Sequence, residues 1–327
     1  MFTAQFSAKT RVYTIRIWLE PEEQSLLKTV QVEARGSYAW DGDDLTSAEG
    51  KLWMGFDHPM ADITSDLDVH AVFITPTLPD AVASGYDYLY SDNPADNSGY
   101  TLEQFCGIIK AKKEKEYFQL KDRIKITPNT DVFADSEIIC EVAGFNHNKL
   151  ADGSGTFAGV IWGMIGAMNA SRRMNSTNTN AGGWPATEAR DIDNNTIFPA
   201  LPRWIRMLIP KVIVLSSAGA TKADIVSSQD YLFRFSHAEV GFDVSSVPYC
   251  NEVDADAESV QLPIFTDNSS RIRKTYNGTG SAVNWWLRSP DPGGSTNFRT
   301  VYSVGGAYSS AATSGYSVVL GFCTYLA

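Results

Sequence analysis

Histidine and cysteine often supply the nucleophiles, general bases and metal ligands of proteins, and this chain of 327 residues contains four of each. They are His58, His70, His147, His237, Cys106, Cys140, Cys250 and Cys323. The cysteines lie far apart and form no C-x-x-C pair, so the sequence predicts neither a zinc site nor a disulfide-stabilised fold. Two disulfide bonds among the four cysteines are still an open alternative. Cys250 and His237 are a formal nucleophile–base pair. Cys323 stands in an apolar run, where a free thiol is usually inert.

An acidic loop at 251–258 offers another kind of chemistry. Its carboxylates alternate with other residues, at Glu252, Asp254, Asp256 and Glu258. The loop lacks the glycine and the bidentate glutamate spacing of a calcium-binding EF-hand. The chain has no P-loop, dinucleotide-binding fingerprint or G-x-S-x-G motif. We therefore expect no enzyme, no cofactor and no metal. The enzyme alternative requires a metal site between His147 and His237, or a reactive Cys250.

A polar segment near the C-terminus carries a different functional pattern. Positions 289–317 hold seven Ser, five Gly and three Tyr, with one Asp, one Arg and no Lys or Glu. Antibody binding loops have a similar composition, because Tyr supplies rigid contact area while Ser and Gly supply adaptable surface. Apolar residues precede the segment at 285–287 and follow it at 318–322, and both runs predict strands. We expect a binding face held between two fixed strands.

Charge and composition exclude several classes of partner. The net charge is −11, and a duplex-binding protein needs a dense basic stripe. The most basic stretch, at 110–115, is short and interrupted, as in a solvated helix end. No apolar run reaches the ~20 residues of a membrane span, and no signal peptide follows Met1. We predict no nucleic-acid partner and no membrane insertion. Exposure of the protein on a surface would require its assembly into a particle, or an export signal outside this sequence.

Periodic segments indicate the elements that would support such a face. A capping box at Thr101 and Gln104, followed by apolar residues at helical spacing, predicts a helix over 101–112. A stripe that includes Phe157 and Ile161 predicts a core helix over 155–171. Further expected elements are a strand or hairpin over 117–126, strands over 138–145, 212–215 and 231–235, a helix over 203–209, and a short strand through Tyr86, Tyr88 and Tyr90.

Residues 11–74 form a separate β-rich pattern. Trp53 and the closing run ITSDLDVHAVF at 63–73 resemble the internalin B-type repeat, also called the Listeria–Bacteroides repeat. Many members have a Gly-Trp core where this chain has Trp53 and Phe56. The resemblance implies a β-grasp-like spacer or adhesion module of extracellular proteins. Residues 2–6 echo 69–73, so 1–10 are expected to be the tail of an upstream repeat or a leader.

A second set of motifs lies in order over 85–327, after an expected linker at 75–100. They are YFQLKDRIKI (117–126), GFNHNKL (144–150), MN (174–175), GGW (182–184), Arg190, LFRFSHAEV (232–240), WWLRSP (285–290) and GFCTYL (321–326). The set resembles a phage- and prophage-associated domain of unknown function with a C-type-lectin-like fold. Trp285, Trp286, Arg288, Ser289 and Pro290 match its fixed residues. The related formylglycine-generating enzymes catalyse with cysteines, but no matching cysteine pair stands near the terminus here.

Such domains occur in the variable proteins of diversity-generating retroelements, whose C-terminal loops are mutated to change the ligand. These retroelements randomise template adenines, mostly in AAC codons. Changing the first two bases of AAC cannot produce Lys, Glu, Gln, Met or Trp. None of these five residue types occurs between 287 and 327, and upstream they are common. The composition agrees with diversification. The alternative explanation is that a region of strands and loops with modest polarity would also be poor in Lys and Glu.

The spacing of apolar residues separates framework from candidate ligand-binding positions. Phe298, Val301, Ser303 and Gly305 are expected to be framework, and Phe322 belongs to the closing strand. The first candidates to face outward and vary are Arg299, Thr300, Tyr302, Val304, Ala307, Tyr308, Ser309 and Ser310. The second group is Asp291, Gly293, Gly294, Tyr316 and Ser317. The three tyrosines and Arg299 would anchor a ligand, because aromatics and Arg carry most interface energy. The alternative to ligand binding is that the three tyrosines are ordinary residues on the surface of a sheet.

The two tryptophans and the arginine of WWLRSP are expected to be scaffold. Neighbours on a strand point to opposite faces, so at least one of Trp285 and Trp286 should be in the core. Arg288 should form a structural ion pair or carbonyl contacts behind the face.

The predicted fold is α+β, with a C-type-lectin-like domain of helices and small antiparallel sheets at 101–327 and its variable region at 285–327. The predicted function is binding of a protein or glycan ligand on a host or neighbouring cell. The protein would be exposed on a virion, as in a tail fibre, or on a cell surface. The alternative is a surface adhesin or lectin of fixed specificity.

Overall fold

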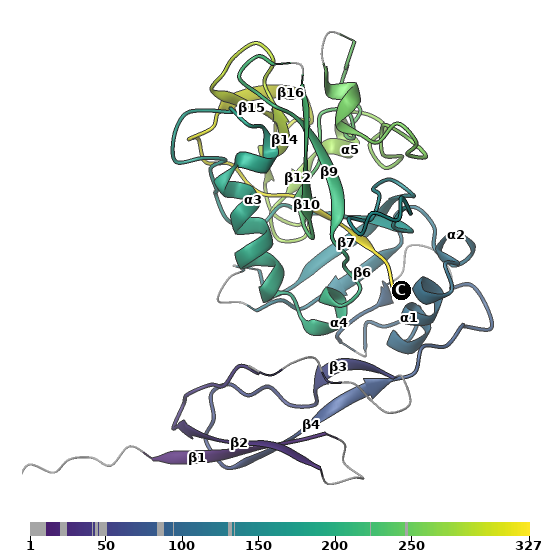
Figure 1. Ribbon diagram of the computed structural model, residues 1–327, viewed down its shortest axis with the longest axis vertical. Coiled ribbons are helices and arrows are strands. Elements are labelled where there is room, and N and C mark those ends of the chain that lie inside the picture. Colours follow the sequence, from purple (N-terminus) through teal and green to yellow (C-terminus); the bar gives the residue numbers. More distant parts are fainter. Residues whose placement is uncertain are drawn as a thin grey trace, which may run out of the picture. The chain divides into compact units, whose positions relative to one another are not determined.

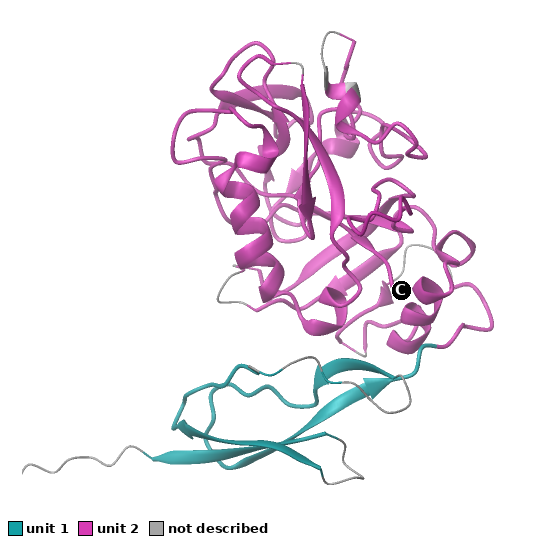
Figure 2. Ribbon diagram, in the orientation of Figure 1, with its two compact units in different colours: residues 1–76 teal, residues 77–327 magenta. Residues whose placement is uncertain are grey.

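The computed structural model describes residues 11–19, 25–40, 42, 45, 51–83, 88–93, 95–129, 133, 135–222, 224–245 and 248–327. The chain divides into two compact units, residues 1–76 and 77–327 (Figure 2). Strands predominate and short helices accompany them, so the fold is α+β, as predicted. The expected upstream-repeat tail at 1–10 lies outside the described residues.

The smaller unit is a four-stranded mixed sheet in the order β2-β1-β4-β3 (Figure 1). Its strands are β1 (Val12–Trp18), β2 (Leu26–Glu33), β3 (Leu52–Phe56) and β4 (Leu67–Ile74). The pair β1–β4 is parallel, whereas β1–β2 and β3–β4 are antiparallel. The β-rich reading of 11–74 is therefore confirmed at the level of strands.

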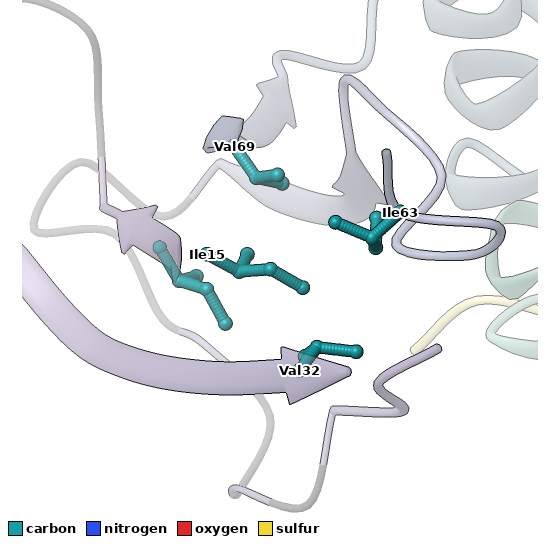
Figure 3. Packing of buried hydrophobic residues seen from close by; sticks show 5 residues of the cluster. Ile15, Val32, Ile63 and Val69 are labelled. Atoms are coloured by element: carbon teal, nitrogen blue, oxygen red, sulfur yellow. The ribbon is translucent and has the colours of Figure 1, made fainter. Parts of the chain in front are cut away.

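Alternation along the strands builds the core of this unit. Ile15 and Ile17 lie on one face of β1 and are fully buried, because side chains two residues apart share a face. They pack with Val32, Ile63 and Val69 in one cluster (Figure 3). Trp40 and Phe56 pack against this cluster, and Trp53 joins them in an aromatic group in which the Trp53 and Phe56 ring centroids lie 5.4 Å apart.

The larger unit is organised by a six-stranded sheet in the order β11-β17-β8-β7-β6-β5 (Figure 1). The strands are β5 (Tyr88–Tyr90), β6 (Arg123–Ile126), β7 (Ile138–Phe145), β8 (Val160–Met164), β11 (Phe233–Arg234) and β17 (Leu320–Thr324). Only β5–β6 is parallel among these pairs. The closing strand of the chain, β17, therefore lies inside the sheet between β8 and β11.

The prediction of a core helix over 155–171 is wrong, because β8 occupies the middle of that segment. Every residue of β8 is buried between β7 and β17. A strand covered on both faces is a short, continuous apolar run, and such a run has no period that separates strand from helix. The glycines at 155, 159 and 166 were the signal against a helix.

The helices of the larger unit are short. They are α1 (Leu102–Lys110), α2 (Glu114–Tyr117), α3 (Glu188–Ile192), α4 (Arg203–Arg206) and α5 (Asn268–Arg271). The capping box that begins α1 is confirmed, since Thr101 Oγ1 accepts a 3.3 Å bond from Gln104 N and Gln104 Oε1 accepts a 3.1 Å bond from Thr101 N. A π-helical turn at Asp193–Ile197 and a 3₁₀ turn at Phe198–Ala200 extend α3, and further 3₁₀ turns lie at Trp184–Ala186 and Pro248–Glu252.

Several predicted boundaries need correction. The strand expected over 117–126 is reduced to β6, because α2 takes its first residue and a turn follows. The strand over 231–235 is only β11, and the helix over 203–209 ends at Arg206. Residues 77–100 belong to the larger unit: Tyr100 is buried, and its hydroxyl donates a 3.1 Å bond to Tyr117 O. Tyr86 lies outside the described residues.

Three small antiparallel sheets complete the larger unit. They are β9 (Val212–Ser217) with β10 (Ile225–Asp230), β12 (Arg273–Lys274) with β13 (Ala282–Val283), and β14 (Trp285–Pro290) with β15 (Asn297–Val301) and β16 (Ala307–Ala311). The strands β14 and β17 thus bracket the Ser/Gly/Tyr segment, as predicted. One end of the segment is tied to the three-stranded sheet and the other to the six-stranded sheet.

Candidate ligand-binding face

Both tryptophans of WWLRSP belong to the core beneath the Ser/Gly/Tyr segment. Trp285 and Trp286 are fully buried, and the indole N–H groups donate to main-chain oxygens of Arg271 (3.1 Å) and Arg172 (2.7 Å). Burying an indole without a partner for its N–H would be costly, so these bonds make the burial possible. The prediction that at least one is core is confirmed, and β14 is covered on both faces.

Arg288 is a fully buried scaffold residue with a partner for each of its five N–H donors. Its terminal nitrogens bond the Glu239 carboxylate at 2.5 and 2.8 Å. The remaining donors reach the main-chain oxygens of Leu215 (2.8 Å), Arg234 (2.9 Å) and Glu252 (2.8 Å). The predicted ion pair and carbonyl contacts are therefore both present. One side chain joins three segments that are distant in sequence.

Two buried glutamates beside Arg288 have opposite pKa shifts. Burial raises the pKa of Glu239, but the charge of Arg288 and the bonds from His147 and Arg288 outweigh burial and hold the pKa at about 2. For Glu252, burial dominates over Arg288 and raises the pKa to about 7. Glu252 accepts a 2.9 Å bond from Ser217 N and a bond from the Ser289 hydroxyl. Glu239 is thus the charged partner, and Glu252 is the carboxyl that titrates near neutral pH.

The hairpin β15–β16 presents the predicted binding residues. Its framework prediction holds for Phe298 and Val301, which are fully buried. Gly305 has a φ of 82°, and a Cβ there would come within 1.8 Å of Asn268 O, so the turn requires glycine. Ser303 N donates a 2.8 Å bond to Asn284 Oδ1. Backbone geometry therefore sets the course of the turn.

The tip and one side of the hairpin are exposed. Val304 is 69% exposed and Tyr308 46% exposed, and Ala307 is also exposed. The rings of Tyr302 and Tyr308 stack with centroids 4.4 Å apart and planes 19° apart. Stacking on one surface fixes both rings at little further entropic cost, which suits contact with a ligand. The predicted outward orientation holds here.

Arg299 and Tyr316 are half-buried and held by neighbours. Arg299 Nε donates a 3.0 Å bond to Tyr249 Oη, whose own hydroxyl donates 2.9 Å to Pro290 O. Tyr316 packs edge-on against Trp286, with ring centroids 5.1 Å apart. Ser309 and Ser317 are half-buried as well. These residues are partly accessible.

Two candidate positions do not face outward. Thr300 is 1% exposed and Ser310 is 6% exposed. Thr300 lies on the middle strand, paired with Trp286 on one side and Tyr308 on the other, so larger rings cover it. Ser310 lies opposite Phe298 and donates a 3.2 Å bond to Tyr316 Oη. The spacing that identified them as outward could not reveal the side chains that flank a central strand.

Asn180 holds the loop that carries the second group of candidates. Its Nδ2 donates to Gly294 O (2.8 Å) and Asn297 O (2.7 Å), and its Oδ1 accepts a 2.7 Å bond from Ala220 N. Gly293 is exposed, and its N–H donates 2.9 Å to Asp291 Oδ1 in a local turn. Asn180 is fully buried. It therefore fixes the loop through main-chain oxygens.

Main-chain bonds also secure the rest of the segment. Met174 N donates 2.9 Å to Ala312 O, and Arg172 exchanges main-chain bonds of 2.9 and 3.1 Å with Tyr316. Ser317 N donates 3.1 Å to Asn284 O. None of these bonds requires a particular side chain in 291–317. Asn180 and Tyr249 were not predicted from the sequence; the abundance of Asn, Thr and Gly at 172–195 is a signal that could have drawn attention to Asn180.

The histidines that could support alternative chemistry have separate partners in the part of the chain that the structure describes. His147 Nε2 lies 3.0 Å from Glu239 Oε1, whereas His237 Nε2 lies 3.2 Å from Asp243 O. Among the described residues, no group of three His, Cys, Asp or Glu side chains is placed to hold a metal ion. Cys106, Cys140 and Cys323 are buried thiols, and the side chain of Cys250 lies outside the described part. In the acidic loop, Lys149 bonds Asp254 (3.0 Å) and Asp256 (2.9 Å).

Part of the larger unit is similar to a known protein family. Residues 160–320 match a domain of unknown function, DUF6273. The matched region contains β8, the buried Arg288–Glu239 pair and the hairpin β15–β16. No curated protein and no solved structure matches the chain. In the part of the chain that the structure describes, no helix is long and apolar enough to cross a membrane.

Proposed function

We propose that this protein binds ligands through the face made by β15, β16 and the loop at 291–296. One observation carries the proposal: the segment 291–317 is attached to buried scaffold through main-chain bonds, while Val304, Ala307 and Tyr308 are exposed. A backbone held in this way keeps its course when exposed side chains change. Surface exchanges usually alter stability within about ±0.5 kcal/mol.

The same attachment supports the proposal that the face is diversified by a retroelement. The five residue types that adenine randomisation of AAC codons cannot produce are all absent between 287 and 327. Within the candidates, we now place variation at the exposed and half-buried positions. Thr300 and Ser310 are left out, since exchanging a buried residue would disturb the sheet.

The folds that we propose are a C-type-lectin-like domain for the larger unit and an internalin B-type, β-grasp-like module for the smaller one. For the larger unit, support comes from a closing strand that returns to the interior of a sheet beside a long, tied loop region. For the smaller unit, it comes from the mixed sheet with parallel β1 and β4. Such modules imply a spacer that carries a binding domain. We propose exposure on a virion or on a cell surface, and a protein or glycan ligand on a host or neighbouring cell.

The second candidate function is an adhesin or lectin of fixed specificity. The stacked Tyr302–Tyr308 pair and the bond from Arg299 to Tyr249 favour it, because both preorganise side chains that diversification would replace. Catalysis is not part of either proposal, since His147 and His237 are bonded to different partners.

The experiment that separates the two functions is sequencing of the genomic locus around codons 285–327. Diversification predicts a near-identical template copy that differs only where the copy has adenine, next to a reverse transcriptase gene. The differences should fall on exposed positions such as Val304, Ala307 and Tyr308. If no copy exists and independent isolates carry one unchanging segment, the fixed adhesin is the correct function. If the differences fall on Phe298, Val301 or Arg288, the proposed binding face is wrong.

A further inference from the structure

A separate hollow in the larger unit lies beside α2, where β7 ends, β8 begins and the chain leaves β17. Its volume is about 410 Å³, within the range of small-molecule sites. In Figure 1, α2 and the C-terminus lie well apart from β15 and β16. The hollow is therefore distinct from the proposed binding face.

Three lysines line this hollow, in the most basic stretch of a chain whose net charge is −11. Lys113 pairs with Glu116 at 2.9 Å, and Lys115 pairs with Glu258. Lys112 is different: its Nζ lies 3.2 Å from the ring centroid of Tyr325 and bonds Leu326 O. Among the described residues, Lys112 has no carboxylate in an ion pair. Within the described part of the chain, Lys112 thus brings to the hollow an ammonium group that bonds a main-chain oxygen and forms no ion pair.

Glu114 supplies a buried carboxyl group to the wall of the hollow. Its side chain belongs to a residue that is 4% exposed, and Oε1 has no hydrogen-bond partner within the described residues. Gly159 makes room for it, because a Cβ at 159 would come within 2.3 Å of Oε1. Burial raises the pKa of Glu114. The unpartnered Oε1 can accept a hydrogen bond from a ligand hydroxyl group.

The rest of the lining suits a hydroxylated ring. Phe157 and Tyr325 are half-buried aromatics, and a ligand would pack against the ring surface that the ammonium groups of Lys149 (5.3 Å from the Phe157 centroid) and Lys112 leave open. Asn146 and Thr156 add an amide and a hydroxyl, which both donate and accept hydrogen bonds. A few convergent polar groups around apolar surface are typical of a site that orients a small ligand.

We propose that this hollow binds an acidic monosaccharide unit, with Lys112 bonding its carboxylate and Phe157 and Tyr325 packing against its ring. Glu114 and Asn146 bond its hydroxyl groups. The lysine explains the charge preference, and the rings and the amide explain why the ligand is a sugar and not a bare anion. The site adds a glycan contact that is independent of the face on β15 and β16.

The test is titration of the full chain with methyl β-glucuronide, with methyl β-glucoside as the neutral match, followed by NMR or calorimetry. We expect a Kd of about 1 mM for the glucuronide and binding at least about tenfold weaker for the glucoside. Lys112→Gln should weaken glucuronide binding about tenfold. The matched control Lys110→Gln, which does not line the hollow, should bind as the unchanged protein does.

The role of Glu114 is tested by two further variants. Glu114→Gln keeps a side-chain oxygen that accepts hydrogen bonds at this position and should retain binding, whereas Glu114→Ala should weaken it about tenfold. Thermal melting of each variant checks that the larger unit is folded. Equal binding of glucuronide and glucoside, or no glucuronide binding at about 50 mM, would overturn the proposal. Equal competition by inorganic sulfate would show a general anion site and overturn the sugar assignment. None of these results depends on whether the locus holds a template copy.

Discussion

Replacing Arg288 by methionine tests whether the buried ion pair holds the scaffold together. Burial alone would raise the pKa of Glu239, yet Arg288 and His147 hold it at about 2, below the ordinary 4.5. That difference corresponds to about 3 kcal/mol, since one pKa unit is worth about 1.4 kcal/mol. Removing one partner of a buried pair usually costs about 3–5 kcal/mol. We expect Arg288→Met to lower the free energy of unfolding of the larger unit by this amount.

The assay is urea unfolding of the full chain, followed by tryptophan fluorescence and fitted with a transition for each unit. Arg299→Met, which changes a half-buried arginine bonded to Tyr249, should lose only about 1 kcal/mol and is the matched control. Arg288→Met combined with Glu239→Gln should lose less than Arg288→Met alone, because no buried charge is left unpaired.

The pH dependence of the stability loss in Arg288→Met is a second test of this prediction. Because the folded pKa of Glu239 is lowered, its contribution to stability is present above pH 4.5 and is lost as the pH falls toward 2. The cost of Arg288→Met should therefore shrink in acid. A loss below about 1 kcal/mol at neutral pH, or a loss that is the same with and without the Glu239 change, would refute the reasoning.

Three further predictions concern the same scaffold and face. Asn180→Ala should destabilise the larger unit by about 2–3 kcal/mol, because Gly294 O, Asn297 O and Ala220 N each lose a hydrogen bond to this side chain. The exposed Asn195→Ala should change stability by less than about 0.5 kcal/mol in the same urea assay. Glu252 has a raised folded pKa, so its stabilising protonated form is fully present below pH 4.5 and is lost as the pH rises through about 7. The stability of the unchanged protein should therefore decrease by about 1–3 kcal/mol between about pH 5 and pH 8, and Glu252→Gln should abolish this decrease. If the variant has the same pH profile of stability as the unchanged protein, Glu252 is not a buried, neutral carboxyl group. Val304→Asp and Tyr308→Ser should each shift stability by less than about 1 kcal/mol, and a larger loss in calorimetry would mean that these positions are framework.

Local chemistry made several elements predictable from the sequence. The capping box at Thr101 begins a helix wherever it precedes an apolar stripe, because its two bonds are made within one turn. The strand 138–145 was identified residue for residue, since a run of that length with β-branched residues suits a buried strand. Arg288 was predicted to form a structural ion pair or carbonyl contacts behind the face, and it forms both.

Only the tertiary structure decided the rest. The run at 160–164 is a strand because β7 and β17 pair with its two edges. Both of its faces are buried, so its sequence shows no alternation that would have identified a strand. Thr300 and Ser310 are buried because Trp286, Tyr308 and Phe298 lie beside them across the sheet. Asn180 and the hollow beside Lys112 depend on contacts between residues more than a hundred positions apart. The sequence by itself determined which segment is polar, aromatic and flanked by strands. The packing of distant segments decided which of its side chains reach solvent, because burial depends on what folds over a residue.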